Sequence, residues 1–242
     1  MTRRNIIAGV IAVLVAIGCT RLGIWQLDRL SQRRDLNGRV YANLAAAPVR
    51  SVDLPADTAQ LRFRRVIVTG VFDFDNQIAL AGRSWRGAPG VHVVTPLRIT
   101  GSNRAVLVNR GWVYSADAVS AELTRWYEPE TATVLGYAEP LPEGSADDPR
   151  SSANSQAWRQ LDFTRLSSML PYPIERYSVV LLSTPGGPAR ANAPVRLTVP
   201  ALSEGPHKGY AFQWFSFAII AVTGVFILIR QDVKSRTMAP GT

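Results

Sequence analysis

Two long apolar runs, one near each end of the chain, constrain the fold more than any other feature of this sequence. Residues 5–27 carry a single charge, Arg21, and residues 210–229 carry none. Written as helices at about 1.5 Å per residue, both runs reach the roughly 30 Å of a hydrocarbon core. A cleavable signal peptide would have a shorter apolar region and a small-x-small cleavage site. The sequence therefore predicts two transmembrane helices, over residues 5–27 and 210–229.

The charges that flank these runs predict the orientation. Arg3 and Arg4 precede the first run, and Arg230, Lys234 and Arg236 follow the second against one acid, Asp232. Short flanks rich in Lys and Arg stay in the cytoplasm. We therefore expect a multi-pass protein of a bacterial inner membrane, with both termini and the tail 230–242 in the cytoplasm. Residues 28–208 would then lie in the periplasm.

The part between the runs has the patterns of a β-rich domain. Residues 27–44 keep helical spacing, so the first helix is expected to continue beyond the membrane. Period-two apolar patterns then predict strands, and a short helix is expected at 163–170. Polar or Gly- and Pro-rich stretches at 143–156 and 184–194 are expected to be loops. The fold class predicted is α+β, a β-rich extracytoplasmic domain flanked by two transmembrane helices. The strands are expected at 66–72, 77–81, 91–97, 105–114, 131–138 and 178–182, with 195–199 as a further candidate.

Composition excludes several classes of function. A single Cys excludes an intramolecular disulfide and a zinc site built of several cysteines, and two His leave little room for a polynuclear metal centre. No common hydrolase, phosphate-binding or redox motif occurs, and the paired carboxylates lie in turn-like contexts. We therefore assign no catalytic residue and expect a protein that is not an enzyme. The net charge of +9 is spread along the chain without a basic tract, so no nucleic-acid partner is expected.

The start of the second run carries a candidate binding site. If a helix begins near His207, then His207, Tyr210 and Trp214 lie on one face. An imidazole at the membrane surface, next to aromatic rings, could ligate haem iron. The same residues could instead form an aromatic interfacial belt or a subunit contact, and all three interpretations stay open. His92, within a strand pattern, is interpreted as structural, with a role as second ligand also open.

The outer end of the first run mirrors this segment. Trp25 and Gln26 have the same pair of side chains as Gln213 and Trp214. Tryptophan and glutamine at one depth suit both the membrane interface and a contact between the helices. Small residues in the two runs could let the helices approach each other or a partner: Gly9, Gly18, Gly23 and Gly224.

Three motifs in register resemble the Surfeit locus protein 1 family, assembly factors for cytochrome c oxidase. The stretch 23–29, Gly-Ile-Trp-Gln-Leu-Asp-Arg, is similar to the family's Gly-x-Trp-Gln-x-x-Arg. Arg29 occupies the last position of this motif. Residues 87–97 together with 108–113 look like its central signature. Residues 207–215 resemble its His-x-x-Tyr-x-x-Gln-Trp entry into the second span. Order, spacing and the two-span layout match over essentially the whole chain.

The resemblance implies a membrane assembly factor that helps haem a reach subunit I of the haem–copper oxidase, or stabilises its assembly intermediates. In bacterial members the histidine that opens the second span is the implied haem a ligand, which corresponds to His207. The segment Asn109-Arg110-Gly111-Trp112 is either functional, with Arg110 paired to a haem propionate or a partner carboxylate, or a strand with a glycine bend. Two alternatives stay open: a permanent accessory subunit of the oxidase, and a membrane-anchored periplasmic enzyme or haem-modifying protein.

Overall fold

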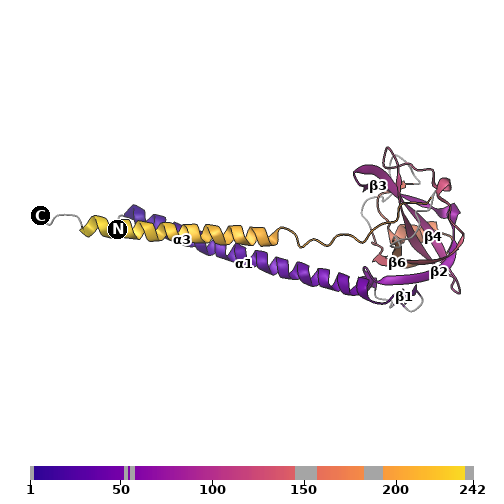
Figure 1. Cartoon of the computed structure of the whole chain (residues 1–242), viewed down its shortest axis with the longest axis horizontal. Helices are drawn as coiled ribbons and strands as arrows, with labels where there is room; N and C mark the ends of the chain where they lie inside the picture. The colour runs from indigo at the N-terminus through magenta and orange to yellow at the C-terminus, as the bar shows by residue number, and fades with distance from the viewer. Residues whose placement is uncertain (1–2, 52–53, 55–57, 145–156, 183–192, 238–242) are drawn as a thin grey trace. The chain divides into compact units, whose positions relative to one another are not determined.

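The computed structural model describes residues 3–51, 54, 58–144, 157–182 and 193–237 (Figure 1). The chain forms two compact units. One comprises residues 1–39 and 201–242, and the other comprises residues 40–200. The boundaries of these units lie near residues 40 and 200, and the first helix continues beyond its apolar run to Ala45.

The first unit is a pair of antiparallel helices. Helix α1 spans Arg3–Ala45 and helix α3 spans His207–Thr237, and Figure 1 shows them side by side. Their direction follows from two contacts: Asn5 donates to Asp232 over 3.5 Å at one end, and His207 meets Gln26 at the other. Both helices are long and apolar enough to cross a membrane. The continuation predicted over 27–44 is present, since α1 reaches Ala45 and is about 64 Å long.

A seam of small residues joins these helices. Buried residues recur at spacings of three and four, which is the spacing of one helix face in a coiled coil. At Gly23 the ring of Phe215 lies so close that a Cβ would stand 2.6 Å from it. Gly18 and Gly224 have open space around them, so of the glycines singled out in the sequence, Gly23 brings the helices together. The buried seam residues are Ala16, Cys19, Gly23, Gln26 and Leu30 on α1, and Ala211 and Ala218 on α3.

The second unit is built on a closed β-barrel. Strand β2 pairs with β6 and β4, and the order β2-β6-β8-β5-β4 therefore returns to β2. Strands β3 and β7 extend the sheet beyond β4, and β1 extends it beyond β2. Most pairs are antiparallel, while β1–β2, β3–β7 and β5–β8 are parallel. The strands are β1 (Val49–Arg50), β2 (Arg65–Phe72), β3 (Ile78–Trp85), β4 (Ala88–Ile99), β5 (Ala105–Tyr114), β6 (Thr131–Pro140), β7 (Ala157–Trp158) and β8 (Ile174–Leu181).

Short helices cover the barrel. They are η2 (Thr58–Leu61), η3 (Phe74–Asn76), η4 (Leu123–Trp126) and α2 (Phe163–Met169). One core fills the barrel, with Val66, Leu97 and Val108 among its fully buried members. Another lies between the outer face of the sheet and α2, around Leu107 and Leu166. Because β5 faces a core on both sides, all its residues but Tyr114 are buried. The α+β class predicted from the sequence is confirmed.

One expected strand is absent from the described residues, and two expected loops lie mostly outside them. Residues 195–199 do not form a strand: they make two isolated bridges, Val195 with Trp112 and Leu197 with Leu182. Apolar character alone does not give a continuous ladder, and Val195 and Val199 are exposed, at 40% and 37%. The loops expected at 143–156 and 184–194 lie mostly outside the described residues, which resume at 157 and 193.

Candidate functional site

His207 is the first residue of α3, where it forms a hydrogen bond to α1. Its Nδ1 lies 2.8 Å from Oε1 of Gln26, a residue only 9% exposed. An amide oxygen can only accept a hydrogen bond. Nδ1 therefore carries the hydrogen and donates the hydrogen bond to Gln26. In a neutral imidazole the other nitrogen, Nε2, then has a free lone pair. The contact therefore selects the tautomer in which Nε2 can act as a ligand.

Gly205 lies beside the Nε2 edge of this ring. It has a φ of +74°, the left-handed region that favours glycine. A Cβ at this position would lie 3.2 Å from Cδ2 and 3.3 Å from Nε2 of His207. Any other residue would crowd the ring edge that carries the lone pair.

Polar contacts fasten the segment before α3 to α1. Arg34 donates to both carboxylate oxygens of Glu204 over 2.9 and 3.0 Å. Arg33 and Asn37 donate to the backbone oxygen of Ser203 over 3.2 and 3.3 Å. We call Arg33, Arg34, Asn37, Ser203 and Glu204 the linker clamp. It holds the chain three to four residues before His207, the first residue of α3.

The other residues predicted around His207 are largely exposed. Tyr210 is 48% exposed, Trp25 is 48% exposed, and Gln213 is exposed. The guanidinium carbon of Arg29 stands 5.5 Å from the centre of the Trp25 ring. Trp214 is half-buried and packs edge-to-face on Phe217, with ring centres 5.9 Å apart. The structure thus joins His207 to Gln26 by a direct contact, while Tyr210, Trp25 and Gln213 form apolar and polar surface on the same helix pair.

The second predicted group, Asn109-Arg110-Gly111-Trp112, lies in strand β5 as a β-bulge. Gly111 pairs with Val93 and Asn109 with Val94, so Arg110 has no partner across the ladder. Asn109 Oδ1 accepts from the Gly111 amide over 3.1 Å. Gly111 has a φ of +127°, and the Val195 carbonyl approaches it too closely for a Cβ. The glycine is therefore required by the backbone.

Arg110 forms a buried ion network. Its side chain is 0% exposed, and its Nε donates to Glu128 over 2.9 Å. Gln77, Thr95 and the Trp126 carbonyl accept three of its other four N–H hydrogens, and Arg196 also binds Glu128. Burial alone would raise the pKa of Glu128, but hydrogen bonds and charges from Arg196 and Arg110 outweigh it and lower that pKa. The Arg110 guanidinium is thus paired within the protein, where it shares the Glu128 carboxylate with Arg196.

His92 belongs to the same part of the barrel. Its Nδ1 accepts from Nδ2 of Asn109 over 3.1 Å, because an amide nitrogen can only donate. Burial, with a smaller effect from the charge of Arg83, lowers the pKa of His92 to about 4. The ring is therefore neutral at pH 7. Next to it, the buried Nε1 of Trp112 has no hydrogen-bond partner among the described residues.

Sequence reasoning missed the residues that hold these groups in place. Glu128 and Arg196 were not singled out, nor were Arg34, Asn37 and Glu204. The pairing of Gln26 with His207 did have a signal. Gly23 and Gln26 continue a spacing of small and polar residues that begins at Ala16, and this spacing marks a face that packs on another helix.

Comparisons with known proteins agree with the resemblance of the motifs. The family model described as SURF1 family matches residues 13–219. A SURF1-like protein of Monosiga brevicollis is 26% identical over 227 residues, which cover 89% of this chain and 85% of that protein. One of Rickettsia bellii is 25% identical, covering 89% and 87%. Surfeit locus protein 1 of Gallus gallus is 22% identical, covering 84% and 69%.

Proposed function

Because the chain belongs to the SURF1 family, we propose that it is a non-enzymatic assembly factor for the haem–copper cytochrome c oxidase. Its client is subunit I with its assembly intermediates. The cargo is haem a, held transiently at the end of the helix pair where α3 begins. The lipid bilayer is its other partner, since both long helices are apolar enough to cross a membrane.

The observation that carries this proposal is the hydrogen bond between His207 and Gln26. A haem iron takes the lone pair of a neutral imidazole nitrogen. The 2.8 Å contact with Gln26 leaves that lone pair on Nε2 and fixes the orientation of the ring. Histidines that bind metals in proteins are commonly held this way by a hydrogen bond from the other nitrogen.

The surroundings of His207 also fit a flat, apolar cargo. Gly205 has no side chain and so adds no atom beside the Nε2 edge of the ring, where a Cβ would lie 3.3 Å from Nε2. Trp25, Tyr210 and Phe212 present exposed aromatic surface on the same helix pair, and Phe212 is 76% exposed. Exposed aromatic rings near a membrane surface can contact a porphyrin, whose own faces are apolar.

The test is retention of haem a by the purified protein. The full chain is expressed in cells that make haem a, and bound haem is identified by its pyridine haemochrome spectrum. We expect the wild type and His92→Ala to retain haem a and His207→Ala to lose it. His92→Ala is the matched control, because the chain has two histidines and His92 lies in the barrel. Absence of haem a from folded wild-type protein would leave His207 as part of an interfacial belt.

The exposed aromatic surface also fits a second candidate, a permanent accessory subunit of the oxidase. Exposed apolar surface that includes Phe212 is a feature of protein–protein interaction sites. Purification of the mature oxidase separates the two functions. Stoichiometric presence of the chain in active oxidase would favour the accessory subunit, and its presence only with immature subunit I would favour the assembly factor.

A further inference from the structure

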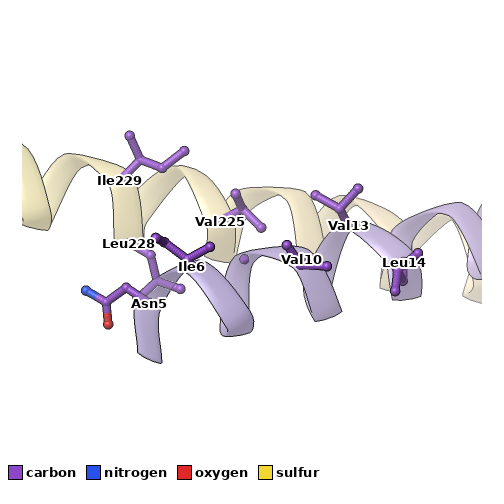
Figure 2. Close-up of a pocket in the computed structure, with 9 residues that line it drawn as sticks. Asn5, Ile6, Val10, Val13, Leu14, Val225, Leu228 and Ile229 are labelled. Atoms are coloured by element: carbon purple, nitrogen blue, oxygen red, sulfur yellow. The ribbon is translucent and has the colours of Figure 1, made fainter. Parts of the chain in front are cut away.

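A groove opens between the two long helices at the end where the chain begins and ends. It has a volume of about 320 Å³, within the range of about 300–1,000 Å³ usual for small-molecule sites. Its walls are aliphatic apart from Asn5, as Figure 2 shows. Gly9 contributes to the opening, since a Cβ there would meet no atom within 4 Å. The lining residues on α1 include Ile6, Val10 and Leu14, and those on α3 are Val225, Leu228 and Ile229.

The length of the groove matches one leaflet of a bilayer. On α1 its lining runs from Asn5 to Leu14, a rise of about 14 Å. A hydrocarbon core is about 30 Å thick, so the groove covers about half of it. Beyond Leu14 the seam is closed, because Ala16 and Cys19 are each only 7% exposed. A transmembrane helix of a partner would need a groove along the full thickness, whereas an acyl chain needs one leaflet.

Charges at the polar end of the groove favour an anionic headgroup. Arg3 and Arg4 precede Asn5 on α1, and Arg230 and Lys234 follow Ile229 on α3; all four side chains are exposed. The guanidinium of Arg230 lies 4.5 Å over the ring of Phe226. Asp232, the acid among the described side chains at this end, accepts from Asn5. Basic clusters beside a membrane span attract anionic lipids.

We propose that this groove binds one acyl chain of an anionic glycerophospholipid from the leaflet next to the chain termini. The headgroup phosphate meets the basic side chains at the helix ends, and the chain lies along the aliphatic walls. The lipid fills the space where the seam opens. It thereby holds the first turns of α1 and the last turns of α3 together. This site is separate from His207, which lies at the opposite end of α3, and it does not depend on the haem proposal.

The test counts lipid on the full-length protein. The protein is purified in a mild detergent from membranes that contain phosphatidylglycerol and phosphatidylethanolamine, and bound lipid is measured by native mass spectrometry. We expect one retained phosphatidylglycerol on the wild type. Gly9→Leu adds a side chain at the groove, where a Cβ meets no atom within 4 Å, and should lower retention about tenfold. Gly18→Leu is the matched control: it adds the same side chain to the same helix in open space, outside the groove, and should retain the lipid.

The charges are tested separately with Arg230→Gln combined with Lys234→Gln. This variant should lose the preference for phosphatidylglycerol over phosphatidylethanolamine. Three results would overturn the proposal. These are a wild type without retained lipid, a Gly9→Leu protein that keeps the lipid, and a Gly9→Leu protein that instead loses a co-purifying membrane protein. The last result would identify the groove as a site for a partner helix. Helical circular dichroism equal to that of Gly18→Leu shows that Gly9→Leu is folded.

Discussion

At the scale of single residues, Gln26 decides which nitrogen of His207 carries the proton. Replacing it by Leu removes the acceptor for Nδ1, so both tautomers become available and the ring loses its fixed orientation. Removing such a hydrogen-bond partner of a metal ligand usually costs about 10–100-fold in affinity. We expect that loss for Gln26→Leu in a titration of the detergent-solubilised protein with haem a. Gln26→Glu keeps an acceptor and should bind nearly as the wild type does.

An unchanged affinity of Gln26→Leu would contradict this role. The contact would then stabilise the helix pair only. Thermal unfolding of the two variants provides the control. Because the Leu side chain can still pack in the seam, a large drop in melting temperature would show that lost haem binding came from lost structure.

His92 gives the barrel a pH-dependent stability. Its pKa is about 4 in the folded chain against an ordinary value of 6.5, so the unfolded chain binds a proton first as pH falls. The stability due to neutral His92 is full above pH 6.5 and is lost between pH 6.5 and 4, by up to about 3 kcal/mol. Unfolding followed by tryptophan fluorescence should show this loss. His92→Gln, which keeps an acceptor for Asn109, should have a flatter pH profile over the same window, and an unchanged profile would contradict the assignment.

At the scale of elements, the network of Arg110, Glu128 and Arg196 holds three segments together. Glu128 follows η4, Arg196 lies in the segment after residue 193, and Arg110 is the bulge of β5. Glu128→Leu leaves the fully buried Arg110 without its counter-charge, which should destabilise the barrel by about 3–5 kcal/mol. Glu175→Ala is the control, because its partner Arg104 is 40% exposed, and exposed pairs contribute at most about 1 kcal/mol. Urea unfolding of the full chain measures both, and similar costs for the two variants would contradict the network.

The linker clamp is expected to act on position rather than on stability. Arg34 and Glu204 are both about half exposed, so their pair contributes little to folding. Glu204→Arg opposes two positive charges and should release the segment before His207, which weakens haem binding by roughly two- to fivefold. The exchange Arg34→Glu with Glu204→Arg should restore it. Equal binding by the single and the double variant would show that the clamp does not position His207.

Local periodicity explains which elements could be predicted. Strands such as β2 and β5 are long enough to show alternating apolar residues, and their predicted ranges agree with the structure. Strands β1 and β7 have two residues each, which cannot show a period. Residues 195–199 look like a strand because they are apolar. They form single bridges instead, Val195 with Trp112 and Leu197 with Leu182.

At the scale of the whole molecule, contacts between segments that are distant in the sequence are the features that the sequence does not predict. Motif resemblance identified His207 and Gln26 individually, and the helix seam could have paired them through its regular spacing. The clamp joins Arg34 to Glu204 across 170 residues, and no local pattern links such positions. From the sequence, a haem propionate was one possible partner of Arg110. Its burial against Glu128 and Thr95 depends on strand pairings between distant segments, which the sequence does not show.

The arrangement of the chain across the membrane is the remaining prediction, and it depends on charge alone. Arg3 and Arg4 on α1, and Arg230 and Lys234 on α3, lie at the same end of the antiparallel helices. Because basic flanks remain in the cytoplasm, this end should be cytoplasmic and the β-barrel unit should be on the outer side. Cysteines introduced in a Cys19→Ala background test this with a maleimide that cannot cross membranes. Asn103→Cys, in the exposed turn between β4 and β5, should be labelled in spheroplasts. Lys234→Cys should be labelled only after lysis, and the reverse pattern would invert the topology and move the lipid groove to the outer leaflet.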